Sequence, residues 1–310
     1  MTEDEKAPIA NPPESSPAAP KLDDELDFGR TALQFFVIPA FVVALCVGVF
    51  VFFAWLVSDE KTSVDYLNEV RAGSASRRWQ AAFELSKIIT MDDENRRMEG
   101  LVREMVLAFE EAETDDPRVR HYLALSLGHL ADAAAVPALV GALRDDEPST
   151  RLYSAWALGS IGDLRALDPV LALVGDNDVG VRKMAVYALG ALGDDQAIPR
   201  LQVALSDPER DVSWNAAIAL AQLDDASGEA QLLQMLDGPF LEGLTNMDGS
   251  QKLLATQSAI QAAALVGGET LTAKLQEVAD AHANLVLREE ALSALAALAE
   301  LENAPAVAEP

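Results

Sequence analysis

A period of 31 residues is the feature that most constrains how this chain can fold. Four segments carry it: VRHYLALSLGHLAD, TRLYSAWALGSIGD, VRKMAVYALGALGD and VSWNAAIALAQLDD, which begin at Val119, Thr150, Val181 and Val212. A leucine recurs in each copy, as Leu127, Leu158, Leu189 and Leu220. A closing aspartate also recurs, as Asp132, Asp163, Asp194 and Asp225. Two columns that keep one period over four copies predict a stack of structural repeats.

Each repeat is predicted to be a pair of antiparallel helices. The quoted segments are rich in alanine and leucine, which favour helix, and a shorter apolar helix follows each one. Pro137, Pro169 and Pro199 fall in the first turn of that shorter helix, where a missing N–H costs nothing. One pair cannot bury its apolar stripe alone, but stacked pairs can. The sequence therefore predicts an all-α solenoid of about seven helix pairs over residues 58–302, with an insertion at 237–252.

The repeat signature VRKMAVYALGALGDDQAIPRL resembles the short HEAT-like repeats of the phycobilisome-lyase type, from about Ser63 to Glu300. The resemblance implies a right-handed α-solenoid in which the long second helix of each pair lines a concave face. It also implies structural roles, in a polar ladder between repeats, for the arginine and aspartate columns. These residues are Arg120, Arg151, Arg182, Asp132, Asp163 and Asp194.

Signatures of catalysis are absent from the sequence. Deoxyhypusine hydroxylase, built on related repeats, binds a di-iron centre through His-Glu pairs, but His121, His129 and His282 are not followed by glutamate. Cys46 is the single cysteine, and there is no Gly-rich phosphate loop and no His-Glu-x-x-His. We therefore expect no catalytic, cofactor-binding or metal-binding residues and no enzymatic activity. The alternative is a lyase-like or protein-modifying enzyme subunit of the HEAT-repeat lyase type.

The net charge of the chain indicates which classes of molecule it can bind. The chain carries −27, with 50 acidic and 23 basic residues. Such a surface repels nucleic acid, because there is no basic stripe to neutralise phosphate. It suits a basic protein partner, or a subunit of a membrane complex.

The sequence of the N-terminal region predicts a disordered tail followed by a membrane anchor. Residues 1–30 are acidic and rich in proline, which is typical of disorder, and residues 303–310 are expected to be a second disordered tail. Leu33–Val57 is uncharged over 25 residues, whereas about 20 suffice to cross a bilayer. We therefore expect a single-pass transmembrane helix within residues 31–57, in the inner (plasma) membrane of a bacterium. A small excess of Lys and Arg after the span favours a cytoplasmic solenoid.

Small residues on one face of this span predict that the spans of two copies of the chain pack against each other. Ala40, Ala44 and Gly48 are four residues apart, a spacing that lets two helices approach closely.

A strip of large side chains on the long helices is the first candidate partner-binding surface. Counted from the arginine column, positions +1 and +5 lie opposite the predicted core and are mostly aromatic or aliphatic. The strip contains Trp79, Phe83, Leu125, Leu152, Trp156, Tyr187, Trp214 and Ile218. Two interpretations stay open: these residues wedge between neighbouring repeats, or they form an apolar groove that receives a partner peptide or helix.

The break in the period is the second candidate surface. Residues 237–252 contain Gly, Pro and Asn, which mark a loop, and insertions between repeats often bind partners. Its candidate contacts are Phe240, Leu241, Leu244 and Met247. The alternative is an insertion that packs on its own chain. Together these features predict a membrane-tethered, non-catalytic scaffold that binds a protein, as an accessory or assembly subunit of a membrane complex.

Overall fold

The computed structural model describes residues 36–57, 61–91 and 100–303. Residues 1–30 and 304–310, which were predicted to be disordered tails, lie outside the described part, as do residues 31–35 of the predicted span. The chain divides into two units at Glu60, and each unit is described by itself.

The first unit contains one apolar helix, α2 (Ile38–Val57), which has no charged residue. Its side chains are exposed from Phe36 to Phe53, and Cys46 is an exposed free thiol. Within the described residues, no helix combines the length and apolar character that a bilayer crossing requires. The predicted transmembrane helix is therefore not supported by the structure.

The second unit is an all-helical solenoid in its described part, and its helices alternate along the chain as the period predicts. In chain order they are α3 (Ser63–Ala72), α4 (Ala75–Met91), α6 (Leu101–Glu111), α7 (Pro117–Leu130), α8 (Val136–Ala142), α9 (Pro148–Ile161), α10 (Leu167–Leu173), α11 (Val179–Leu192), α12 (Ile198–Ala204), α13 (Arg210–Gln222), α14 (Glu229–Leu236), α15 (Gly238–Glu242), α16 (Gly249–Val266), α17 (Glu269–Ala281) and α18 (Leu285–Asn303). Short 3₁₀ turns η2 (Ala133–Ala135), η3 (Leu164–Ala166), η4 (Asp195–Ala197) and η5 (Ala226–Gly228) link successive helices.

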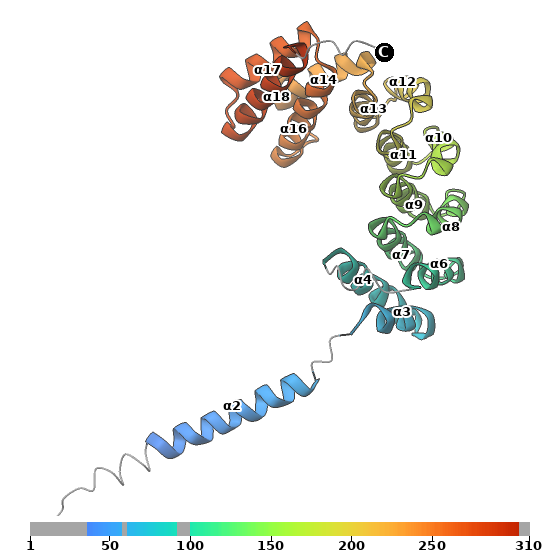
Figure 1. The fold of residues 1–310 in the computed structure, drawn as a ribbon, viewed down its shortest axis with the longest axis vertical. Coiled ribbons are helices and arrows are strands. Elements are labelled where there is room, and N and C mark those ends of the chain that lie inside the picture. The colour runs from blue at the N-terminus through green and yellow to red at the C-terminus, as the bar shows by residue number, and fades with distance from the viewer. Residues whose placement is uncertain (1–35, 58–60, 92–99, 304–310) are drawn as a thin grey trace, which may run out of the picture. The chain divides into compact units, whose positions relative to one another are not determined.

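The long and short helices occupy opposite sides of this curved unit. Helices α7, α9, α11 and α13 follow one another along the inner side of the curve, and α8, α10 and α12 lie on its outer side (Figure 1). Neighbouring long helices pack directly on one another, and each short helix packs on the long helix that follows it. Because the long helices recur with the 31-residue period, their inner faces together form one continuous surface.

Glycines at one column of the repeat let the long helices approach closely. A Cβ added to Gly159 would lie 2.8 Å from the Cα and 3.0 Å from the Cβ of Ala188 on the next long helix. Gly128 and Gly190 face similar backbone contacts on α9 and α13. A larger residue at these positions would push two backbones apart, which explains why the core is built from Ala, Gly and Leu.

The predicted polar ladder is present between the repeats. Arg151 binds Asp176, 25 residues later, with an N–O distance of 2.7 Å, and it also donates to the carbonyl oxygen of Asp145. Arg182 binds Asp207 at 2.8 Å in the same way. Arg120 binds Asp145 at the equivalent place, but from one nitrogen only. Each arginine thereby ties its own long helix to the turn before the next one, and the largely buried pairs of Arg151 and Arg182 are bidentate.

Two of the three acceptor aspartates of this ladder, Asp176 and Asp207, have a lowered pKa. Burial raises the pKa of Asp176 and of Asp207, but hydrogen bonds from Arg151 and Arg182, respectively, together with a backbone N–H for each, outweigh it. The pKa of both carboxyl groups therefore lies below its usual value.

The closing aspartates have a structural role, but they are not part of the arginine ladder that the resemblance implies, because the arginines bind Asp145, Asp176 and Asp207 instead. Asp132, Asp163, Asp194 and Asp225 each accept a hydrogen bond from a backbone N–H in the 3₁₀ turn that follows. The side chain of Asp163 also binds Arg165, whose hydrogen bond lowers the pKa of that carboxyl to about 2. These residues cap the turns at the end of each long helix.

The core consists of two clusters that meet at α13, and the insertion belongs to the second. One cluster runs from Leu67 to Leu223 and the other from Trp214 to Leu298. The insertion was predicted to be a loop, but it forms the short helix α15, capped by Asp237, with Leu241 buried. It therefore packs on its own chain, because an apolar residue of the insertion completes the second cluster.

Candidate functional site

The inner wall of the solenoid, defined as the exposed faces of α4, α7, α9, α11, α13 and α16, is the candidate functional site. The residues at the +1 and +5 positions, apart from Trp214, are half-buried or exposed on it. The +2 and +9 positions share this wall, and sequence reasoning missed them. With a rotation of 100° per residue, the +2 and +9 positions lie within about 60° of the +5 position around the helix axis. A helical wheel of the sequence could therefore have placed them on the same face. They contribute Tyr122, Tyr153, Met184, Asn215 and Ser258, and at +9 His129, Gln222 and Leu265.

Aromatic contacts between repeats organise the N-terminal half of the wall. The rings of Phe83 and Tyr122 meet edge to face with centroids 5.2 Å apart, and His129 meets Trp156 in the same way at 5.1 Å. Such pairs contribute about 0.5–1.5 kcal/mol beyond their buried area. They also fix the side chains in one arrangement, so the wall is ordered before any partner arrives.

The predicted contact residues divide into exposed, half-buried and buried groups. Tyr187 is 46% exposed, and Phe83 and Phe240 are each 37% exposed. Half-buried residues pack partly against the core and partly face solvent; they are Trp79, Leu125, Leu152, Trp156, Ile218, Leu244 and Met247. The strip is therefore both a contact between neighbouring repeats and an accessible surface, because the same side chains pack between repeats on one side and face solvent on the other.

Two predicted contact residues are corrected by the structure. Trp214 and Leu241 are each only 4% exposed and belong to the second core cluster. Trp214 lies at the +1 position, but there the insertion and α16 cover the indole. Neither residue presents a free surface to a partner.

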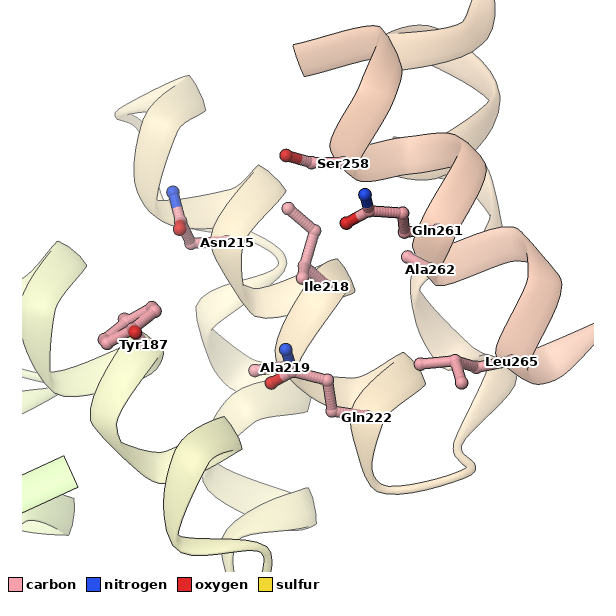
Figure 2. A pocket seen from close by; sticks show the side chains of 9 residues that line it. All are labelled: Tyr187, Asn215, Ile218, Ala219, Gln222, Ser258, Gln261, Ala262 and Leu265. Carbon is pink, nitrogen blue, oxygen red and sulfur yellow. The ribbon is translucent and has the colours of Figure 1, made fainter. Parts of the chain in front are cut away.

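A hollow of about 510 Å³ opens in the wall between α11, α13 and α16. Figure 2 shows Tyr187 on one side, Ile218 and Asn215 in the middle, and Gln261 and Leu265 on the other side. Its lining also includes Gln222 and Ser258. Amide side chains carry both donors and acceptors, so this hollow offers neutral hydrogen bonding beside apolar surface. That combination suits the backbone and an uncharged side chain of a protein segment.

A second hollow of about 310 Å³ joins the first to the insertion. Asn215, Ile218 and Ser258 line both hollows. The insertion contributes Asn246 and Met247 to the second. The two candidate surfaces predicted from the sequence thus lie next to each other in the C-terminal half of the wall.

The histidines serve as packing and hydrogen-bonding residues. His121 stacks on Tyr153 at 5.0 Å, and its Nε2 lies 2.9 Å from Oγ of Ser149. Burial lowers the pKa of His121, against the opposing charge of Glu147. His282 accepts a hydrogen bond from the N–H of Asn284 at its Nδ1. Within the described residues, no group of three or more His, Cys, Asp or Glu side chains is placed to hold a metal ion.

Acidic residues are scarce in the helices of the inner wall, where α4 contains Glu84 alone. Helices α7, α9, α11 and α16 contain no Asp or Glu, and α13 contains Asp211 alone. The whole chain has 50 such residues, so their exclusion from these helices is strong. The acids lie instead in the turns along the two edges of the solenoid and in other helices, such as α3, α6, α17 and α18.

The comparisons with known proteins establish the repeat type. Residues 107–186 and 170–243 match the family model for HEAT repeats. Together the two matches span residues 107–243 of the all-helical solenoid, so HEAT repeats are shown for that part. No curated protein sequence matches the chain.

Of two solved structures that match the chain, only one has a TM-score above 0.5. The complex of CpcE and CpcF of phycocyanin lyase from Nostoc sp. PCC7120 is 21% identical with a TM-score of 0.56, and the match covers 82% of this chain and 92% of that one. Human deoxyhypusine hydroxylase in complex with glycerol is 20% identical with a TM-score of 0.30, covering 77% of this chain and 98% of that one. At these identities the first likeness shows a shared fold and nothing about chemistry.

Proposed function

We propose that this protein is a non-catalytic scaffold that holds a segment of a partner protein on the inner wall of its solenoid. The observation that carries the proposal is the chemistry of that wall. It is acid-free over four helices, and it combines the exposed ring of Tyr187 with a neutral hollow lined by amides. Aromatic anchors beside satisfied polar groups are typical of protein-binding surfaces.

The side chains of the two hollows also support the absence of catalysis. Amides, a serine hydroxyl and apolar groups dominate the lining, with Lys183 and Asp211 as an ion pair at its edge.

Binding to the wall is tested with two matched double variants. Tyr187→Asp with Leu265→Asp places charge on exposed wall positions, while Val203→Asp with Leu107→Asp does the same on exposed positions of the outer helices α12 and α6. Both pairs should keep the wild-type helical circular dichroism. In affinity purification from detergent-solubilised membranes, the wall variant should lose the partner and the outer variant should retain it. Loss in both, or in neither, would contradict the proposal.

A lyase-type role is the second candidate, and the fold shared with the CpcE and CpcF complex favours it. Incubation of the purified protein with a bilin distinguishes the two. The scaffold proposal expects no bound chromophore absorbance, whereas a stable bilin complex abolished by Tyr187→Asp would favour the lyase.

The second part of the proposal is a membrane tether formed by residues Leu33–Val57, with the solenoid on the cytoplasmic side of the inner membrane. Its support is the uncharged sequence, which extends beyond the residues whose side chains the structure describes, and the exposed apolar side chains of α2. The protein should resist carbonate extraction, and Leu45→Arg with Phe50→Arg should release it. Extraction of the wild type would refute the tether.

Pairing of two tethers through Ala40, Ala44 and Gly48 belongs to the same proposal. A Cβ on Gly48 would meet nothing within 4 Å, so that position is open to a second helix. Gly48→Ile should abolish cross-linking between two copies in membranes.

A further inference from the structure

A second group of insertion residues lines a hollow that is separate from those of the inner wall. This hollow has a volume of about 240 Å³ and lies between α15, the start of α16 and the turn that joins α17 to α18. The insertion contributes Gly238, Glu242, Gly249 and Lys252 to its lining. The described residues that line it are all different from those that line the two hollows of the inner wall. The proposed function therefore leaves this hollow without a role.

Lys252 brings a largely buried positive charge to this hollow. Its side chain is only 17% exposed, and a lysine ammonium group has three N–H donors. One of them donates to the carbonyl oxygen of Glu242 at 3.3 Å. The carboxylate of Glu242 is 3.6 Å away, beyond hydrogen-bonding distance, and the Glu242 side chain is 84% exposed. Because a largely buried ammonium group needs good acceptors, Lys252 has donors to offer to a ligand.

His282 adds an N–H donor to the same lining. Its Nδ1 accepts a hydrogen bond from the backbone N–H of Asn284 at 3.1 Å, so Nδ1 carries no proton. The proton of a neutral imidazole is then on the other nitrogen, which makes Nε2 the donor. Two nitrogen donors, one of them charged, therefore line one small hollow in a chain with 50 acidic and 23 basic residues.

Three aspartates at the helix ends around this hollow make hydrogen bonds within their own helices. Asp237 and Asp248 accept backbone hydrogen bonds as the caps of α15 and α16, and Asp280 accepts one from a side-chain amide in α17. Glu242 is thus the acid that competes for Lys252, and its exposed side chain can turn to solvent at little cost. The net charge of −27 opposes an anion at long range, so an anion should bind here weakly, with a Kd of about 1–10 mM.

The size of the hollow limits the rest of the ligand. Each water molecule takes up about 30 Å³ in the liquid, so 240 Å³ corresponds to a group of about eight non-hydrogen atoms. Pockets for drug-sized molecules are larger, at about 300–1,000 Å³. Leu253 and Leu287 line the hollow beside Lys252 and give it an apolar part. These dimensions fit one branched aliphatic side chain together with one small anionic group.

We propose that this hollow binds an aliphatic carboxylate, with one oxygen at Nζ of Lys252 and the other at Nε2 of His282. A carboxylate has one charge and two oxygens, which matches the two donors of the lining. A phosphate monoester has up to two charges and three acceptor oxygens, and part of it would stay unpaired. Two sources supply an aliphatic carboxylate of this size: a small organic acid, and the C-terminus of a protein whose last residue is apolar. The site goes beyond the proposed function and does not depend on it.

The first test compares 4-methylpentanoate with its neutral analogue 4-methylpentanamide, which has the same shape. Each is titrated onto the full-length protein in lipid nanodiscs, with empty nanodiscs as the blank, and binding is followed by saturation-transfer NMR. The acid should bind with a Kd of about 1–10 mM, and the amide at least about tenfold more weakly, because only the acid pairs with the ammonium group. Equal binding of the two, or no binding of the acid above the blank, would overturn the inference.

Variants of the charged residues localise the contact. Lys252→Met should weaken binding of the acid at least about tenfold. Lys274→Met is the matched control, because the Lys274 side chain is 19% exposed and pairs with Glu277 in α17. Glu242→Gln, at an exposed position that should not affect folding, removes the competing carboxylate and should tighten binding about two- to threefold. Equal loss in both lysine variants, or weaker binding in Glu242→Gln, would refute the assigned contact.

A pair of peptides distinguishes the two sources of the carboxylate. A short peptide that ends in leucine with a free carboxylate is compared with the same peptide amidated at its C-terminus. Tighter binding of the free-acid peptide than of 4-methylpentanoate assigns the site to a protein C-terminus, and binding of 4-methylpentanoate alone assigns it to a small acid. Either result supports the carboxylate site. Equal binding of the two peptides would contradict it.

The wall variant Tyr187→Asp with Leu265→Asp separates this inference from the proposed function. It should bind 4-methylpentanoate as the wild type does, because neither residue lines the hollow. If this variant retains its protein partner, the proposed function fails and the carboxylate site stands. If it loses the acid as Lys252→Met does, the hollow is not an independent site and the inference fails.

Discussion

Replacing glycine by alanine at two helical positions should change stability in opposite directions. Gly159 lies in α9 with Ala188 of α11 against it, and an added Cβ would come within 2.8 Å of the Cα of Ala188. Both atoms belong to packed backbones, so relief requires the helices to separate. Such overpacking costs about 1–3 kcal/mol, while alanine recovers about 1 kcal/mol of helix propensity. Gly159→Ala should therefore destabilise the solenoid by up to about 2 kcal/mol.

Gly141 supplies the matched control. It lies in α8, and an added Cβ would meet nothing within 4 Å. Gly141→Ala should stabilise the protein by up to about 1 kcal/mol, because only the propensity and the unfolded-chain entropy change. Thermal unfolding followed by circular dichroism measures both, and 1 kcal/mol corresponds to about 2–4 °C in a domain of this size. If Gly159→Ala were as stable as the wild type, close approach of the long helices would not explain the glycine column.

Three further predictions concern the ladder and the core. Asp176→Asn should cost about 1–3 kcal/mol in urea unfolding, because Arg151 loses its charged partner, while exposed Glu113→Gln should change stability by less than about 0.5 kcal/mol. The pKa of Asp176 is lowered in the folded protein, so its carboxylate stabilises the fold above the ordinary aspartate pKa of about 4, and this stabilisation is lost as the pH falls through the folded pKa. The difference in unfolding free energy between the wild type and Asp176→Asn should therefore shrink in that pH range. A difference that stays constant would contradict the assigned ionisation. Leu158→Ala, at a fully buried position, should cost about 2–5 kcal/mol, and Leu164→Ala, at an exposed one, less than about 0.5 kcal/mol; similar losses would mean that the repeat leucines are not the core.

The repeat architecture was predictable because its signal is redundant. The leucine, arginine and aspartate columns each report the 31-residue period, and a stack of helix pairs is the arrangement that satisfies all three. The arginine–aspartate pairing itself was not predicted, although Asp145, Asp176 and Asp207 recur with the 31-residue period, since the partners lie 25 residues apart and meet only when the repeats stack.

The candidate site was predictable only in outline. The helical periodicity correctly predicted that Tyr187 and Phe83 face the inner wall, because the positions that share one side of a helix follow from the sequence of that helix alone. It could not show that Trp214 would be covered, since that depends on how the insertion folds back between α14 and α16. The edge charges were visible in the sequence, but which of them are neutralised depends on contacts between repeats.

The central claim, that the inner wall holds a protein partner, is tested most directly by site-specific photo-crosslinking in intact cells. A photoreactive phenylalanine at position 187 samples the wall, and the same residue at exposed position 203 samples the outer side. The account predicts a discrete crosslinked product from position 187 that is absent from position 203. The same products from both positions, or a product from position 203 alone, would contradict it.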